Sequence, residues 1–167
     1  MVKSQLMNRK KIKAIIYDFD GTIVNTEASH LEAWQRTLDD FGFKLTDLSS
    51  KIRLNMIGKK PITIAKEIVK HLQLKVSPND LFNKKSGYLL ENIYDTVKLN
   101  SGIEAVLKYQ KNKRYKIAIG SSGEKNYIIK VLTKFNLLNY FDVIITGEEI
   151  NKGKPNPETY ITAMNKL

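Results

Sequence analysis

The strongest constraint on the fold is a set of short apolar segments, each of which ends at a polar loop. The segments cover residues 12–17, 116–120 and 141–146. They are followed by Asp18-Phe19-Asp20-Gly21-Thr22, Ser121-Ser122-Gly123 and Gly147-Glu148-Glu149. Isoleucine-rich runs of this length are typical of parallel strands buried on both faces. Apolar residues recur at helical spacing before the second run and between the second and third, so the sequence predicts an α/β core with a parallel sheet.

The stretch between residues 28 and 97 has a different pattern, in which helical stripes follow one another without a convincing strand. One stripe begins at Leu31, a second follows Pro61, and Ser77 is placed to cap a third. An all-helical insertion after the first strand is a natural lid over the carboxyl ends of the strands. We therefore assign residues 1–27 and 98–167 to a core domain and residues 28–97 to a helical cap domain.

Composition excludes several classes of protein. The 167 residues contain no cysteine, which excludes disulfides, thiolate metal sites and a cysteine nucleophile. The net charge of +11 is dispersed, and 24 of the 28 basic residues are lysine, so we expect small anionic ligands and no nucleic-acid partner. The sequence has no run of about 18 apolar residues, and its first residues lack the apolar stretch of a secretory signal. These features predict a cytoplasmic protein without a membrane anchor.

Two carboxylates, Asp18 and Asp20, follow the first predicted strand and precede Gly21. This arrangement suits phosphoryl transfer, because one aspartate can act as nucleophile and the other can donate and accept protons. A magnesium ion could bridge the two carboxylates to the phosphate. The alternative is a plain turn, since aspartate and glycine are ordinary turn residues.

Further groups after the second and third predicted strands can stabilise the charge that develops during phosphoryl transfer. Ser121 offers a hydroxyl, the amides of Ser122 and Gly123 offer donors, and Lys154 offers a cation. Taken alone, Ser121 could be a helix N-cap and Lys154 a solvated lysine. Their order after the three predicted strands favours the catalytic interpretation.

The motifs together resemble the haloacid dehalogenase superfamily of phosphohydrolases, in its branch with a helical cap. Asp18-Phe19-Asp20-Gly21-Thr22 is similar to the first motif, in which the first aspartate is the nucleophile and the second the general acid and base. Ser121 and the Gly153-Lys154-Pro155 segment are similar to the second and third motifs. The resemblance implies a Rossmann-like core and catalytic roles for Asp18, Asp20, Ser121 and Lys154.

Candidate substrate-binding residues lie in the second motif and in the cap. Ser122 and Gly123 form the loop that would hold the phosphate. The resemblance also suggests His30 at the hinge, Lys84 as a cap lysine that reaches the substrate, and Lys59 for selectivity. The alternatives are a structural role for His30 and a solvated face formed by Lys84 and Lys85.

The resemblance implies a Mg²⁺ cofactor held by Asp18, Asp20 and an acidic fourth motif, and that motif does not occur after Lys154. We therefore expect the C-terminal strands that carry it to be missing from this chain. The predicted function is a Mg²⁺-dependent phosphatase that acts on a small phosphorylated metabolite through an aspartyl-phosphate, as a monomer or weak dimer. Two alternatives stay open: a phosphomutase similar to β-phosphoglucomutase, and an inactive remnant that binds phosphorylated ligands or another protein.

Overall fold

The computed structural model describes residues 12–56, 58–91 and 93–167. The first residues of the chain, which we assigned to the core domain and found to lack a secretory pattern, lie outside these ranges. None of the helices in the described part of the chain has both the length and the apolar character needed to cross a membrane.

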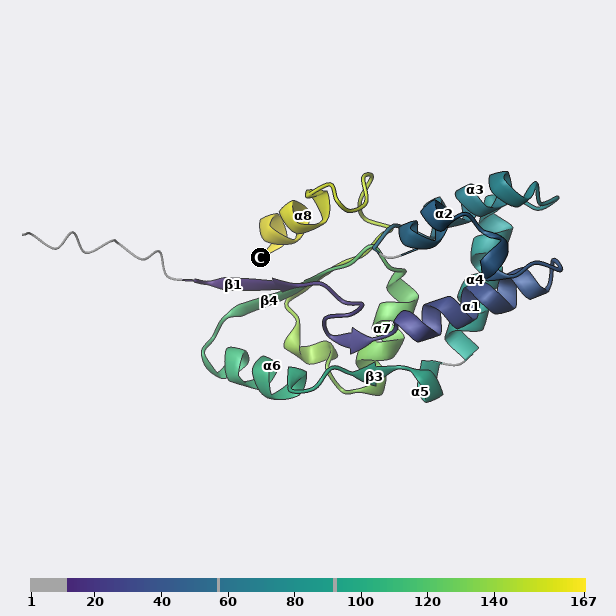
Figure 1. Ribbon diagram of the computed structural model, residues 1–167. Helices are drawn as coiled ribbons and strands as arrows, with labels where there is room; N and C mark the ends of the chain where they lie inside the picture. The colour runs from purple at the N-terminus through teal and green to yellow at the C-terminus, as the bar shows by residue number, and fades with distance from the viewer. Residues whose placement is uncertain (1–11, 57, 92) are drawn as a thin grey trace, which may run out of the picture.

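Three parallel strands form the central sheet in the order β1-β4-β5 (Figure 1). They are β1 (Ala14–Tyr17), β4 (Lys116–Gly120) and β5 (Val143–Ile145), and each lies within one of the predicted segments. Ala118 pairs with Ile16 on one side and with Val143 on the other. The predicted α/β fold with a parallel sheet is confirmed.

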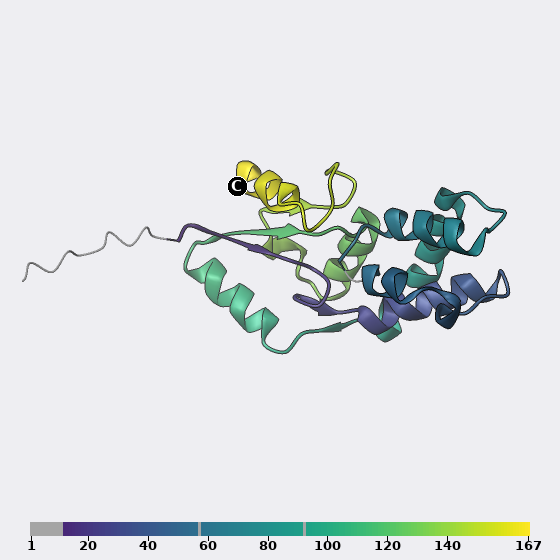
Figure 2. The same ribbon diagram turned by 45° about the horizontal axis from the view of Figure 1, so that its top comes forward.

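Helices cover both faces of this sheet. On one face, α6 (Ile103–Asn112) and α7 (Lys125–Lys134) pack over a cluster that includes Ile117 and Ile119. On the opposite face, α8 (Glu158–Lys166) packs over Ala118 and Ile145, as the view in Figure 2 also shows. Alternate residues of β4 thus point into two separate apolar clusters, which explains why this strand is apolar after Lys116.

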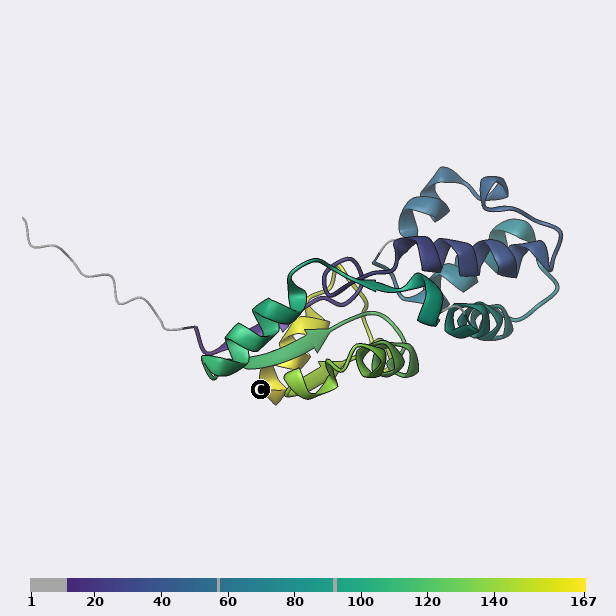
Figure 3. The ribbon, with the colours of Figure 1, turned by 90° about the horizontal axis from the view of Figure 1, so that it is seen from below.

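The helical segment between β2 and β3 has a third apolar cluster of its own. It contains α1 (Glu27–Asp39), α2 (Ser50–Asn55), α3 (Pro61–Leu72), α4 (Pro78–Glu91) and the short α5 (Ile93–Thr96), and Figure 3 shows it beside the sheet layer. Trp34, Leu38 and Ile68 are among its buried residues. Two 3-10 turns, Leu45–Asp47 and Leu138–Tyr140, complete the regular structure of the described residues.

A short antiparallel pair joins the two ends of the helical segment. Strand β2 (Val24–Asn25) pairs with β3 (Lys98–Leu99). The pair places the start of α1 beside the end of α5, and the Ser29 hydroxyl donates a 3.0 Å hydrogen bond to the Thr96 hydroxyl. The helical segment therefore leaves and re-enters the core through one narrow connection.

Candidate active site

The loop after β1 carries two aspartates on either side of a fully buried phenylalanine. Phe19 packs edge-on against Tyr127 of α7, with ring centroids 5.9 Å apart. Gly21 has a φ of 74°, a conformation that glycine adopts without strain, and it turns the chain back toward β2. The buried ring and the tight turn fix Asp18 and Asp20 at the carboxyl end of β1.

Asp18 forms an ion pair with Lys154, which lies in the loop between β5 and α8. Asp18 Oδ2 is 2.6 Å from Lys154 Nζ, and Asp18 Oδ1 accepts the Phe19 N–H at 2.7 Å. The Asp18 side chain is 37% exposed and that of Lys154 is 17% exposed. The carboxylate is thus accessible to a ligand and already has a cation beside it, which can neutralise part of the charge of an incoming anion.

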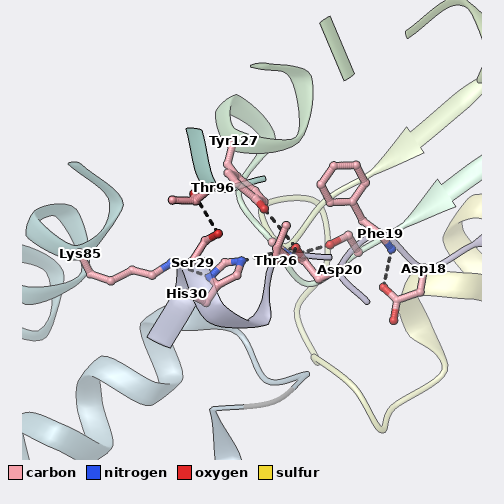
Figure 4. A network of polar contacts seen from close by, with 11 residues as sticks. Asp18, Phe19, Asp20, Thr26, Ser29, His30, Lys85, Thr96 and Tyr127 are labelled. Carbon is pink, nitrogen blue, oxygen red and sulfur yellow. Dashed lines mark hydrogen bonds and ion pairs between the residues drawn. The ribbon is translucent and has the colours of Figure 1, made fainter. Parts of the chain in front are cut away.

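Asp20 is held differently, because three side chains converge on one of its oxygens (Figure 4). Asp20 Oδ1 accepts hydrogen bonds from the Thr26 hydroxyl at 2.7 Å and the Tyr127 hydroxyl at 3.3 Å, and lies 3.4 Å from His30 Nε2. Burial raises the pKa of Asp20, but the contact with His30, the Thr26 hydrogen bond and the Lys85 charge outweigh it and hold the pKa below its usual range. The two aspartates therefore have clearly different surroundings.

A fully buried lysine of the helical segment extends this network. Lys85 Nζ, from α4, lies 3.1 Å from His30 Nδ1, as Figure 4 shows. Since an ammonium has only donors, His30 Nδ1 accepts and the Nε2 proton points at Asp20. Burial lowers the pKa of Lys85 to about 8, although the charges of Glu124 and Asp20 oppose this shift. Asp20 is thus connected through His30 to a cation from outside the sheet layer.

The loop after β4 supplies hydrogen-bond donors at the same edge of the sheet. The Ser121 side chain is buried, and its hydroxyl oxygen accepts the Gly123 N–H at 2.9 Å. The hydroxyl proton of Ser121 stays free to donate. Ser122 is also buried, and its hydroxyl oxygen has no hydrogen-bond partner among the described residues. The structure thus brings Asp18, Asp20, Ser121 and Lys154 to the carboxyl ends of the strands, as the sequence predicted.

Comparison with known proteins agrees with this geometry. The family model of haloacid dehalogenase-like hydrolases matches residues 15–167. The chain belongs to this family. Among its relatives, a phosphorylated carbohydrates phosphatase of Thermotoga maritima is 27% identical over 157 residues, which cover 93% of this chain and 71% of the relative. A fructose-1-phosphate phosphatase of Escherichia coli is 26% identical over 158 residues, which cover 95% of this chain and 81% of the relative.

Solved structures share the fold of this haloacid dehalogenase-like hydrolase. β-Phosphoglucomutase of Clostridium difficile superposes with a TM-score of 0.79 at 23% identity, over 93% of this chain and 71% of the other. CbbY of Rhodobacter sphaeroides, solved with phosphate, gives a TM-score of 0.78 at 20% identity, over 94% of this chain and 73% of the other. The resemblance inferred from the motifs is confirmed at the level of family and fold.

Two lysines that we expected at the substrate lie elsewhere in this hydrolase. Lys84 is exposed and pairs with Asp40 at 2.7 Å, at the end of α1. Lys59 pairs with Glu67 of α3 at 3.2 Å. Neither lysine reaches the carboxyl ends of the strands, because each is held by an acidic residue of the helical segment.

The sequence analysis predicts Lys84 as the cap lysine at the substrate, whereas the lysine of α4 that is buried near the site is Lys85. The position of each lysine around the helix explains the difference. Leu81, Lys85 and Leu89 recur every fourth residue and are all buried. A lysine on this apolar stripe was the available signal for a buried cation. Tyr127 lies on the apolar face of α7, and the contact of its hydroxyl with Asp20 could not be inferred from the spacing of apolar residues.

The residues described here do not form a complete magnesium site. Within residues 12–56, 58–91 and 93–167, no group of three His, Asp or Glu side chains could hold a metal ion. One oxygen of Asp18 is paired with Lys154, and Asp20 Oδ1 already accepts two hydroxyl groups. Glu148 and Glu149 face other partners, since they accept the backbone N–H groups of Lys125 and Thr146.

Proposed function

We propose that this chain is a phosphatase that hydrolyses a small phosphorylated metabolite, a sugar phosphate or a similar ester. The observation that carries the proposal is the contrast between the two aspartates. Asp18 is accessible and paired with Lys154, which suits a nucleophile, whereas Asp20 is held by hydroxyl groups and a histidine, which suits a group that moves protons. The names of the phosphatase relatives add support for this substrate class.

In the first step, a carboxylate oxygen of Asp18 attacks phosphorus, and the bond between phosphorus and the ester oxygen breaks. The leaving alcohol takes a proton from Asp20, and an aspartyl-phosphate is left on Asp18. Lys154 and the Ser121 hydroxyl stabilise the charge on the phosphoryl oxygens. The pKa of Asp20 lies low without ligand, and the negative charge of a bound phosphate raises it toward the acid form that donates.

In the second step, water attacks the aspartyl-phosphate and gives its proton back to Asp20. The bond between phosphorus and the Asp18 oxygen breaks, which releases inorganic phosphate and restores the enzyme. The hydrogen bonds from Thr26 and Tyr127 stabilise the carboxylate form of Asp20 and orient it for this transfer.

We also propose that residues 28–97 act as a cap domain over a core domain of residues 1–27 and 98–167. Three polar contacts support a cap that covers the site, because each holds the helical segment against the core near Asp20 or near the cavity beside it. His30 contacts Asp20, the Ser86 hydroxyl donates to Glu124, and Lys60 Nζ donates to the Ile150 carbonyl. Water would be excluded from the aspartyl-phosphate while these contacts are formed.

A second candidate is an inactive protein that binds phosphorylated ligands. It is favoured by one observation, the lack of a third metal ligand among the described residues. Mg²⁺ supplies charge neutralisation when it is bound in phosphatases of this kind. Mg²⁺ remains the proposed cofactor, with Asp18 and Asp20 as the ligands that this chain contributes.

The deciding experiment is a phosphate-release assay on sugar phosphates and p-nitrophenyl phosphate, with and without Mg²⁺. Asp18→Asn removes the nucleophile, and we expect it to lower kcat by at least about a thousandfold. Release that survives this substitution would show that the aspartyl-phosphate mechanism is wrong. Ligand binding without any turnover would favour the inactive alternative.

A further inference from the structure

A cavity of about 260 Å³ lies between the helical segment and the core. We call it the cap–core cavity. Ile62 of α3 and Phe82 of α4 form apolar parts of its wall, and Gly123, Glu124 and Glu148 belong to the wall on the core side. Its volume is slightly below the range of about 300–1,000 Å³ that is common for ligand pockets, which limits it to a small occupant.

The cap–core cavity is next to the groups proposed to react. Gly123 belongs to its wall and also donates its N–H to Ser121 Oγ at 2.9 Å. A Cβ atom placed on Gly123 would lie 3.6 Å from Asp20 Oδ2. An ester whose phosphate lies at Ser121 and Asp20 can therefore extend its alcohol part into this cavity.

Two carboxylates, Glu124 and Glu148, belong to the polar part of the wall, which also contains Lys60, Asn79 and Ser122. Glu124 Oε1 accepts the Ser86 hydroxyl at 2.8 Å, and Glu148 Oε1 accepts the Lys125 N–H at 3.0 Å. The second oxygen of each carboxylate has no hydrogen bond to any residue that the structure describes. Lys60 is the lysine in the wall, and its Nζ is directed at the Ile150 carbonyl.

We propose that Glu124 selects substrates whose alcohol part is neutral and carries hydroxyl groups, and that it rejects substrates with a second phosphate. This inference rests on the proposed phosphatase function and specifies its substrate class. Sugar hydroxyls donate to the free oxygens of Glu124 and Glu148, while the sugar ring packs against Ile62 and Phe82. A second phosphate faces two carboxylates instead, and like charges at close range disfavour binding.

The test compares fructose 1-phosphate with fructose 1,6-bisphosphate, by kcat/KM and by calorimetric Kd for each. We expect the wild type to favour the monophosphate by about tenfold or more. Glu124→Gln keeps the acceptor for Ser86 but removes the charge, and Glu124→Lys reverses it. The preference for fructose 1-phosphate becomes smaller in Glu124→Gln. In Glu124→Lys it becomes smaller still, or changes to a preference for the bisphosphate.

Two controls separate charge from structure. Glu104→Gln makes the same charge change on an exposed residue of α6 and leaves the preference unchanged. Ser86→Ala removes the hydrogen bond to Glu124 but keeps the carboxylate, so it changes kcat/KM for both substrates by the same factor.

The outcomes distinguish this inference from the function on which it rests. A preference that is equal in the wild type and both Glu124 variants, or a wild type that prefers the bisphosphate, overturns the selectivity and leaves the phosphatase function standing. A wild type that neither hydrolyses nor binds any phosphate monoester overturns the proposed function, and the selectivity with it.

Discussion

Lys85 Nζ lies 3.1 Å from His30 Nδ1, although the two residues belong to different helices and are 55 positions apart in the sequence. His30 in turn contacts Asp20, so a buried cation of α4 is connected to a carboxylate at the end of β1. Because a buried charge is costly unless it is paired, this arrangement is stable only while α4 stays close to the core. The network thus links the position of the helical segment to Asp20, the proposed proton-transfer group.

Lys85→Met should increase stability at neutral pH. The pKa of Lys85 falls from 10.5 to about 8 on folding, which corresponds to about 3 kcal/mol of penalty for the charged form. This penalty is fully present below pH 8, where Lys85 is charged in both states. Between pH 8 and 10.5 the folded protein loses this proton while the unfolded chain keeps it, so stability rises with pH. After the loss of one hydrogen bond to His30 is subtracted, we expect a gain of about 1–2 kcal/mol in urea unfolding at pH 7.

The neighbouring lysine provides a matched control. Lys84→Met removes an exposed ammonium that pairs with Asp40, and the pKa of Lys84 is raised, so this variant should gain no stability. The wild type should also become more stable between pH 8 and 10.5, and the Lys85→Met variant should lack this gain. If Lys85→Met proved less stable than the wild type at pH 7, the buried ammonium would have to be a net stabilising group.

Thr26→Val should shift the acid limb of the pH profile of kcat, measured where hydrolysis of the aspartyl-phosphate limits the rate. Thr26 is buried and donates a 2.7 Å hydrogen bond to Asp20 Oδ1, which lowers the pKa of that carboxyl. Valine has a similar shape but no donor, so the pKa of Asp20 rises. The carboxylate form is needed to accept a proton from water in the second step, so kcat is lost at a higher pH than in the wild type.

A second buried threonine of the same region tests whether this shift is specific. The Thr37 hydroxyl donates to the Ala33 carbonyl within α1. Thr37→Val should leave the acid limb in place even if it lowers stability. Overlapping profiles of Thr26→Val and wild type would mean that Thr26 does not set the pKa of Asp20.

The parts of the fold that the sequence predicted are those fixed by local pattern. The strands β1, β4 and β5 follow from apolar runs, and Pro61 and Ser77 mark the starts of two helices correctly. The β2–β3 pair could not be predicted, because each strand has two residues and its partner is more than 70 positions away. The sequence Ser101-Gly102-Ile103-Glu104 has the spacing of a capping box and predicts an N-cap at Ser101. This prediction is wrong, because the N-cap of α6 is Gly102, which has a φ of 80° and makes no side-chain cap.

The site divides in the same way between what is local and what depends on three-dimensional contacts. Asp18, Asp20 and Ser121 each follow a strand directly, so parallel strand order places them together. His30 was weighed between a structural and a substrate-binding role, and its actual neighbour, Lys85, depends on how α4 packs against α1. Contacts between separate helices leave no signature at a fixed spacing, which is why the network was missed.

Lys154→Met should strengthen Mg²⁺ binding. The Lys154 ammonium lies 2.6 Å from Asp18 Oδ2 and so repels a divalent cation at the same carboxylate. Without it, no ammonium competes with the cation at Asp18, and we expect the calorimetric Kd for Mg²⁺ to fall by about tenfold. Asp18→Asn should bind Mg²⁺ more weakly than the wild type. Equal Kd values for wild type and Lys154→Met would show that Mg²⁺ does not bind at Asp18.

Gly147→Ala should displace the loop of Ser121, Ser122 and Gly123 that follows β4. A Cβ at this position would overlap the Ser122 carbonyl, which belongs to the backbone and cannot move without displacing Ser121. We expect a loss of about 1–3 kcal/mol in unfolding free energy and a larger than tenfold loss of kcat/KM. Gly87→Ala is the control, because nothing lies near its Cβ in α4 and alanine favours the helix by about 0.5–1 kcal/mol. If Gly147→Ala kept the activity and stability of the wild type, the close approach of Gly147 to the Ser122 carbonyl would have no role in positioning the Ser121 hydroxyl.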